Sequence, residues 1–296
     1  MNNMVSRSSQ WVSHIFLLTF SILCIIPFVL LIVSSISSEQ VIVTNGYRFW
    51  PEAFSMDAFK YLMANSNVIT RAYGITVFVT VLGTAVSLFM TLMLGYGLSR
   101  TDMPYNRLFA FFVFFTLLFN GGLVPTYIIY TQYFEIKNTI WSLIVPGLLM
   151  NGFNVFLAST FFRTTIPVPV MESARIDGAG EFRTFFQIVL PLALPITATI
   201  GLFSGIAYWN DWNNGLIYLT DPKLFSIQNL LNQMIQNIEA IKTSSTAYGA
   251  GSVAMTLPSE TVRMAIAVVG IIPILVAYPF FQKYFVKGIA IGAVKG

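Results

Sequence analysis

Few side chains in this 296-residue sequence could carry out covalent or metal chemistry. The chain has 12 aspartates and glutamates, one histidine and one cysteine. General acid–base catalysis needs a positioned pair of titratable groups, and a metal site needs several His, Cys, Asp or Glu ligands. This composition leaves little material for either, so we predict no catalytic residue and no metal ligand. Cys24, the one cysteine, cannot form a disulfide within the chain.

The most informative spacing lies in the segment 163–189, and the chemistry it could support is recognition. Pro167 and Pro169 suit the first turn of a short helix, and Gly178 and Gly180 supply the freedom to end it and begin a second. The second helix has an apolar face at helical spacing, made of Phe182, Phe185, Phe186 and Val189. Two interpretations remain open: a helix lying on the membrane interface of its own bundle, or a docking element for a separate cytoplasmic protein. Docking would use small residues for close approach and charged residues at a rim, here Ala174, Gly178, Ala179, Glu172, Arg175 and Asp177.

The overall composition identifies the surroundings in which this segment is held. Hydrophobic residues make up 56% of the chain and charged residues 9%, against about 45–50% and about 25% in soluble domains. A soluble fold could not keep so much apolar surface from water. The chain is therefore expected to lie in lipid. Its net charge of +4 then reflects cytoplasmic loops rather than nucleic-acid binding, which we exclude.

Six apolar stretches are long enough to cross a bilayer, for which a helix needs about 20 residues. None contains Lys, Arg, Asp or Glu, and the first is too long for a signal peptide. The predicted fold is an all-α membrane protein, a single transmembrane domain over residues 1–296 with six transmembrane helices. The predicted spans are 12–33, 73–98, 108–134, 138–162, 188–210 and 264–282.

The basic residues indicate how these spans are oriented. Nine lysines and arginines fall on the side that holds both termini and seven on the other, and the nine lie in shorter segments with fewer acids. Because cytoplasmic segments carry the positive excess, both termini and the segment 163–189 are expected in the cytoplasm. Four spans are also interrupted, which simple kinks or mobile elements lining a path could both explain. The breaks are expected at Asn120-Gly121-Gly122, Pro146-Gly147, Pro195 and Pro273.

The cytoplasmic segment resembles the EAA loop of ABC-importer permeases. That pattern is Glu-Ala-Ala, three residues, Gly, nine residues and Ile-x-Leu-Pro, and Glu172-Ser173-Ala174, Gly178 and Ile188-Val-Leu-Pro191 match its spacing, with Ser173 in place of one alanine. Further motifs resemble the carbohydrate-uptake permeases of the maltose type, above all the subgroup for complex oligosaccharides or polysaccharide fragments. These motifs begin at Asn120, Asn138, Ile176, Trp209 and Lys287.

The resemblance implies the type I ABC-importer permease fold and a role for the loop 163–189. In that family the loop forms a coupling helix seated in a groove of a cytoplasmic ATPase. Carried over, the coupling residues are Glu172, Ser173, Ala174, Asp177, Gly178 and Ala179. No G-x-x-x-x-G-K-[ST] motif is present, so this chain is expected to bind no cofactor and the partner ATPase to bind ATP and Mg²⁺. The tail 286–296 could be a flexible basic segment near anionic lipid, or could reach between the ATPase subunits as the family implies.

The family also implies partners and a substrate path. The partners are a second, homologous permease in a heterodimer, two ATPase subunits, an extracytoplasmic solute-binding protein, an oligosaccharide and membrane lipid, at the bacterial cell membrane. The two long outer segments, 38–70 and 219–262, could receive the binding protein or merely pack over the bundle. Aromatic rings could stack on sugars while polar groups bond hydroxyls, although an aromatic belt explains the tryptophans equally well. The path candidates are Trp209, Asn210, Asp211 and Trp212, with Asn120, Asn151 and Asn154 added from the family.

Three other functions compete with this one. An ion-gradient-driven transporter needs charged residues inside its spans, and the six spans have none. An ABC importer of a non-sugar solute would share the same loop. A membrane scaffold would leave the loop free to vary, so it predicts that Glu172→Lys changes nothing.

Overall fold

The computed structural model describes residues 7–64, 66–247 and 259–293, and these residues form helices joined by loops. Among them no strand occurs, and one isolated β-bridge joins Ser37 to Phe54. The all-α fold predicted from the sequence is confirmed. Two compact units divide the chain, Met1–Asn67 with Gln233–Pro273, and Val68–Asn232 with Ile274–Gly296. They are described here one at a time.

The first unit contains a long apolar helix and several short elements. In α1 the large apolar side chains are exposed along most of the helix, as a lipid-facing helix requires. In α3 the Ser55 hydroxyl accepts a hydrogen bond from the Asp57 amide at 3.1 Å, which satisfies one of the first amides of the helix. The elements are α1 (Arg7–Ser35), α2 (Glu39–Asn45), α3 (Asp57–Ala64), the end of α14 (Ile227–Ala247) and the start of α16 (Ser259–Ala293).

A carboxylate joins α2 to the first turn of α16 within this unit. The oxygens of Glu39 accept hydrogen bonds from the amides of Glu260 and Thr261, both at 2.9 Å, and from the Thr261 hydroxyl at 2.7 Å. The first amides of a helix have no partner inside it, and an anion there also suits the helix dipole. Arg263, on the same turn, pairs with Glu239 of α14 at 2.8 Å. Polar contacts therefore hold three elements together.

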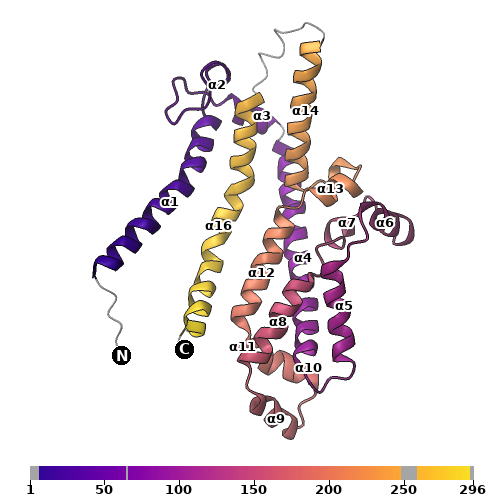
Figure 1. Ribbon diagram of the computed structural model, residues 1–296. Coiled ribbons are helices and arrows are strands. Elements are labelled where there is room, and N and C mark those ends of the chain that lie inside the picture. The colour runs from indigo at the N-terminus through magenta and orange to yellow at the C-terminus, as the bar shows by residue number, and fades with distance from the viewer. Residues whose placement is uncertain (1–6, 65, 248–258, 294–296) are drawn as a thin grey trace. The chain divides into compact units, whose positions relative to one another are not determined.

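In the second unit the long helices α4, α5, α8 and α12 run side by side (Figure 1). Small residues let them approach closely, as is common in membrane bundles. A Cβ built on Gly95 of α4 would lie 2.7 Å from that of Ala158 on α8, and one on Gly83 would lie 2.6 Å from the ring of Tyr208 on α12. The helices are α4 (Ser66–Ser99), α5 (Asn106–Leu118), α8 (Gly152–Thr165) and α12 (Leu194–Trp209).

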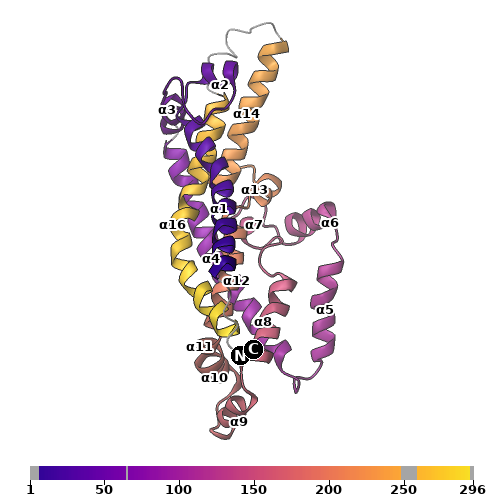
Figure 2. The ribbon, with the colours of Figure 1, turned by 60° about the vertical axis from the view of Figure 1, so that its left-hand side comes forward.

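Short elements occupy the two ends of this bundle (Figure 1, Figure 2). One end holds α9 (Val168–Ile176), α10 (Glu181–Thr184), the π-helical η2 (Phe185–Val189) and α11 (Leu190–Leu192). The other end holds α6 (Leu123–Ile128), the π-helical η1 (Ile129–Tyr133), α7 (Trp141–Ile144), α13 (Asn213–Tyr218) and the 3₁₀ turn η3 (Pro222–Leu224). The bundle therefore separates two sets of loops.

Three of the four expected breaks are present. The third predicted span bends by 115° between α5 and α6, where Gly122 has φ +83°. The fifth bends by 86° just before α12, where Pro195 lies in the first turn and cannot donate an amide hydrogen bond. The fourth, expected over 138–162, consists of α7 and α8 separated by Pro146 and Gly147, the latter with φ +71°.

One expectation for the C-terminal region is wrong. The sixth span was expected to break at Pro273, but α16 continues through it, because a helix of 35 residues can lose one hydrogen bond and still continue. For residues 286–296 the sequence left open a flexible basic tail or a segment reaching between the ATPase subunits, and in the structure α16 runs on to Ala293. The glycines there lower helix stability by about 1 kcal/mol each but do not exclude a helix. Residues 294–296 lie outside the described part.

The number of membrane crossings is only partly visible. Within the described residues, Gln10–Ser35 and Ser66–Ser99 are each long and apolar enough to cross a bilayer. Counting each of the two bent pairs as one span raises this to as many as four. The count of six and the cytoplasmic position of the termini stay predictions.

Candidate functional site

The loop 163–189 folds as a helix, a glycine turn and a second helical segment, as its sequence predicts. Helix α9 has Pro169 in its first turn, where the missing amide is harmless. It ends in a Schellman motif, in which the amides of Gly178 and Ala179 donate to the carbonyls of Arg175 and Ala174 at 3.0 and 2.9 Å. Gly178 has φ +74°, a conformation that favours glycine, and no atom lies within 4 Å of where its Cβ would be.

Helix α9 has an inward face and an outward face. Met171 packs on the core cluster of the bundle, and Ala174 is only 5% exposed. Of the other predicted coupling residues, Ala179 is half-buried, and Glu172, Ser173, Asp177 and Gly178 are exposed. The structure therefore places Ala174 inside this chain and leaves the exposed four free to meet a partner.

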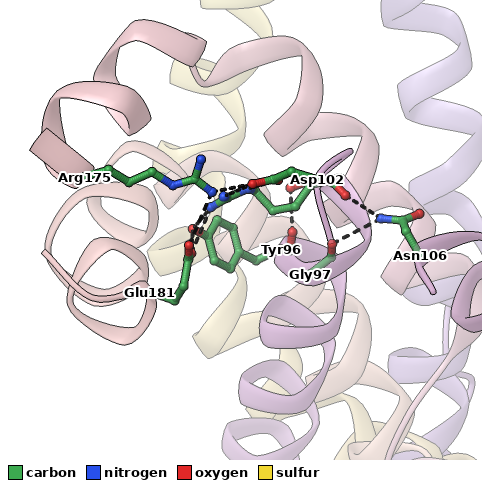
Figure 3. A network of polar contacts seen from close by, with 8 residues as sticks. Tyr96, Gly97, Asp102, Asn106, Arg175 and Glu181 are labelled. Atoms are coloured by element: carbon green, nitrogen blue, oxygen red, sulfur yellow. Dashed lines mark hydrogen bonds and ion pairs between the residues drawn. The ribbon is translucent and has the colours of Figure 1, made fainter. Parts of the chain in front are cut away.

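Arg175 does not extend outward with the exposed residues. Its guanidinium pairs with the Asp102 carboxylate in the turn between α4 and α5, and lies 3.5 Å from a carboxylate oxygen of Glu181 on α10 (Figure 3). Sequence analysis had placed Arg175 on the rim of a docking surface. In the structure its charge is used within the chain.

Arg100, at the end of α4, is the most buried charge of this group. Its Nε and Nη2 donate to the two oxygens of Asp102 at 2.9 and 2.8 Å, and its Nη1 donates to Glu181 at 2.8 Å. The side chain is 16% exposed, against about half for its three charged neighbours. The hydrogen bonds from Arg100 hold the pKa of Asp102 below its usual range.

Tyr96 connects these charges to the apolar core. Its hydroxyl donates to Glu181 at 2.9 Å and accepts from Arg100 at 2.9 Å. Its ring packs against Phe185 of η2 and Phe162 of α8, with centroids 5.3 and 6.3 Å apart. Phe185 and Val189 are buried, whereas Phe182 and Phe186, expected on the same apolar face, are exposed.

The last backbone carbonyls of α4 accept hydrogen bonds from side chains of α5 and α8. The amide of Asn106 donates to the carbonyls of Arg100 and Leu98 at 2.6 and 3.1 Å (Figure 3). Arg163, at the end of α8, donates to the Leu98 carbonyl at 3.0 Å, where a cation also suits the helix dipole. The end of α4 is therefore fixed by contacts with three other segments.

Sequence reasoning missed Arg100, Asp102 and Glu181 as parts of this site. They entered only the charge balance that set the orientation of the spans. A usable signal existed, because charges of both signs flank two predicted spans that end on the same side, and such charges often pair. Nothing in the local pattern, however, says which of them meet.

The second candidate site, at the α12–α13 junction, is built differently. Trp209 is half-buried with its ring 6.4 Å from that of Tyr73, and Trp212 is 46% exposed. The amide of Asn210 donates to the Ile206 carbonyl at 3.0 Å, within its own helix. The four predicted path residues of this motif lie together at one helix end.

Asp211 is the unusual member of that motif. Its Oδ1 accepts from the Asn214 amide at 3.2 Å, whereas its Oδ2 is buried without a hydrogen-bond partner among the described residues. Burial raises the pKa of this carboxyl. A buried polar atom without a partner is costly, so the site has capacity for one more donor.

The three asparagines added from the family lie at two other junctions. Asn120 accepts from the Gly122 amide at 2.9 Å, in the turn between α5 and α6. Asn151 caps α8 by accepting from the amides of Phe153 and Asn154 at 2.9 and 3.3 Å. Asn154 itself is 8% exposed. Two of the three therefore have a local structural use.

The fold and the loop define a class of protein, a helical membrane permease. Residues 61–291 match the family described as "Binding-protein-dependent transport system inner membrane component". The chain belongs to this family and is an inner-membrane component of an ABC transporter, not an enzyme. It has the type I permease fold and works with an ATPase and a binding protein.

Individual relatives cover nearly the whole chain. The polygalacturonan/rhamnogalacturonan transport system permease protein YtcP of Bacillus subtilis is 38% identical over 99% of this chain and 100% of its own. Protein LplC of the same species is 35% identical over 92% and 90%. A solved bacterial ABC transporter, involved in the import of the acidic polysaccharide alginate, superposes with a TM-score of 0.78 at 27% identity, covering 96% of this chain and 100% of the matched one.

Proposed function

We propose that this chain is the transmembrane subunit of an ATP-driven, binding-protein-dependent importer of oligosaccharides derived from complex polysaccharides. The observation that carries the proposal is the similarity to a polygalacturonan/rhamnogalacturonan permease over 99% of the chain. The match to an alginate importer supports the same class of solute. Neither relative favours a non-sugar solute or an ion-driven carrier.

The proposed complex contains this chain and a homologous, non-identical permease, two ATPase subunits and an extracytoplasmic binding protein. ATP and Mg²⁺ bind to the ATPase subunits. Both termini and the loop 163–189 face the cytoplasm, and the six predicted spans cross the membrane. The positive excess in the inner segments supports this orientation.

The outward face of α9 and the turn after it are the proposed ATPase contact. Glu172, Ser173, Asp177 and Gly178 are exposed there, and Ile176 in the same helix is 86% exposed. An exposed isoleucine between polar residues suits a surface that is buried in a complex. Ala174 and Ala179 support this contact from the inner side of the turn.

The proposed solute path includes the α12–α13 junction. Trp209 and Trp212 would stack on sugar rings, and Asn210 and Asp211 would bond hydroxyl groups. The free Oδ2 of Asp211 supports this role, because a sugar hydroxyl is a suitable donor for it. Asn154, with Asn120 and Asn151, contributes from the neighbouring helix ends.

Charge reversal at Glu172 tests the proposed function. In proteoliposomes containing the whole complex, Glu172→Lys should abolish the ATP hydrolysis that solute-loaded binding protein stimulates. Arg183→Glu is the matched control, since Arg183 is exposed in the same loop and donates only to Gln187 at 2.9 Å among the described contacts. Wild-type stimulation in Glu172→Lys would refute the docking role, and uptake driven by an ion gradient without ATP would support a secondary transporter.

A second experiment tests the orientation of the loop. Cys24 is replaced by Ser, and Asp177 by Cys, so that one exposed thiol remains. A membrane-impermeant thiol reagent should label inside-out vesicles and leave intact cells unlabelled. Labelling from outside the cell would overturn the cytoplasmic position of the loop.

A further inference from the structure

Four charged residues form a closed ring around the base of α9. Arg100 contacts Asp102 and Glu181, both at 2.8 Å, and Arg175 contacts the same two carboxylates. Positive and negative charges therefore alternate around the ring, and the net charge is zero. Arg175 and Asp102 are 73 residues apart in the sequence, and Arg100 and Glu181 are 81 apart. We call Arg100, Asp102, Arg175 and Glu181 the charge ring.

We propose that the charge ring fixes α9 to the cytoplasmic end of α4, so that a force on α9 moves α4 instead of bending the loop. The proposal rests on the proposed ATPase contact of α9. It assigns Arg100, Asp102, Arg175 and Glu181 as positioning residues for coupling, since they would act through α9 and α4 without touching the solute or ATP.

The ring spans the glycine turn that follows α9. Arg175 precedes Gly178 and Glu181 follows Gly180, so the two glycines lie between two members of the ring. No atom lies within 4 Å of the Cβ position of either glycine, so packing does not stiffen the turn. Without the ring, α9 would be held to the bundle by Met171 and Ala174 on its inward face. A flexible turn would absorb a displacement that the ring can transmit.

The other side of the ring is anchored rigidly. The Arg100 guanidinium lies over the aromatic side chain of Tyr96, 5.8 Å from its centroid, and donates a hydrogen bond to the Tyr96 hydroxyl. Tyr96 belongs to the buried core cluster that joins α4, α8, η2 and α12. The bidentate pairing of Arg100 with Asp102 adds a fixed orientation, which a single ion pair would not give. A displacement of α9 therefore reaches the packed core through α4.

The geometry of α4 extends this connection along the bundle. The helix has 34 residues, and its glycines allow close contact with the backbone of α8 at Gly95 and with the Tyr208 side chain of α12 at Gly83. Tyr208, which packs on Gly83, lies three residues before Asp211 in the proposed solute path. One rigid helix thus links the charge ring to the opposite set of loops.

Stability alone does not account for the ring. Three of its four side chains are about half exposed, and exposed ion pairs contribute little to stability. A role limited to folding therefore predicts small losses of assembly and melting temperature. A role in coupling predicts a separate change in the solute transported per ATP hydrolysed.

The test measures the ratio of solute transported to ATP hydrolysed, in proteoliposomes that contain the whole complex and its binding protein. Arg175→Glu places three carboxylates together and should lower the ratio by about tenfold, while the ATPase subunits still copurify. Arg175→Lys keeps the charge and should retain most of the coupling. Arg183→Glu reverses a charge in the same loop outside the ring and should leave the ratio at the wild-type value.

A double-mutant cycle shows whether the ring acts as a unit. If it does, the double variant Asp102→Asn/Arg175→Gln should transport no less solute per ATP than the more impaired of the two single variants. Additive losses would overturn the proposal, and so would a wild-type ratio in Arg175→Glu. If Arg175→Glu transports as much solute per ATP as the wild type while Glu172→Lys loses stimulated ATP hydrolysis, the role of the charge ring is rejected and the ATPase contact is retained. Full activity in both would reject the ATPase contact as well.

Discussion

The two ends of the α4–α12 bundle use polar residues in opposite ways. At the α9 end, four charged side chains pair with one another, and three of them are about half exposed. At the α12–α13 end, the one carboxylate of the motif is half-buried, and its buried Oδ2 has no partner among the described residues. Paired charges are suited to holding a position, whereas an unpaired group is suited to meeting a ligand.

Their glycines differ in the same way. At the α12–α13 end, a Cβ on Gly215 would lie 2.4 Å from the amide nitrogen of Asn229, which is fully buried. At the α9 end, Gly178 has open space around it and is required for its backbone conformation. Packing prevents a larger side chain at Gly215, whereas the backbone conformation of a turn prevents one at Gly178. Equivalent substitutions at the two positions should therefore have different consequences.

The largest effect on stability is expected from Gly215→Ala. The added methyl group must displace the buried Asn229, and overpacking of this kind costs about 1–3 kcal/mol. The melting temperature of the detergent-solubilised complex should fall accordingly. Gly121→Ala, at a position with no atom within 4 Å, is the control and should melt like the wild type. An unchanged melting temperature in Gly215→Ala would show that this end is less tightly packed than the contrast requires.

A smaller cost in stability, but a clear loss of coupling, is expected from Gly178→Val. The left-handed conformation costs an ordinary residue about 1–2 kcal/mol, so the end of α9 should reorganise. Stimulated ATP hydrolysis should fall about fivefold or more. Gly180→Ala is the control, because Gly180 has φ −69° and open space. Equal losses in the two variants would attribute the effect to the loop in general.

The smallest stability change, and one of opposite sign, is expected from Asp211→Asn. Burial raises the folded-state pKa of Asp211, so as pH rises above about 4 the unfolded chain loses its proton first and the folded protein is destabilised. The neutral variant should therefore gain about 1 kcal/mol at pH 7, and the gain should vanish as pH falls below about 4. Solute uptake should decrease at the same time.

Asp221→Asn is the matched control for that experiment. Its carboxylate caps the η3 turn by accepting from the Lys223 amide at 2.9 Å, and asparagine caps equally well. Neither stability nor uptake should change. A variant at Asp211 that is more stable and transports normally would remove this residue from the solute path while leaving its burial explained.

Local features of the fold were predictable because glycine and proline act on their immediate neighbours. The break at Asn120-Gly121-Gly122 and the turn at Gly178 both follow from backbone rules that need no partner. Pro273 shows the limit of such rules, since α16 continues through it. The break depends on the hydrogen bonds around the proline, and the sequence pattern does not reveal them.

The candidate sites were predictable only in part, for a related reason. The spacing of Glu172, Ala174 and Gly178 identifies the loop, and the structure places Glu172 and Gly178 at its surface. The inward turn of Arg175 depends on Asp102, 73 residues earlier, so a local pattern cannot contain it. Likewise, Trp209 and Asp211 stand out in the sequence, whereas the buried Asn229 does not.

The Glu39 carboxylate that caps α16 has a consequence for how the chain is made. Its amide partners are 221 and 222 residues further along, so they leave the ribosome long after α2 has been made. This link between α2 and α16 can therefore close only after residue 261 has been made. Chains that stop before residue 260 will lack this link, so these hydrogen bonds cannot join α2 to α16 in them.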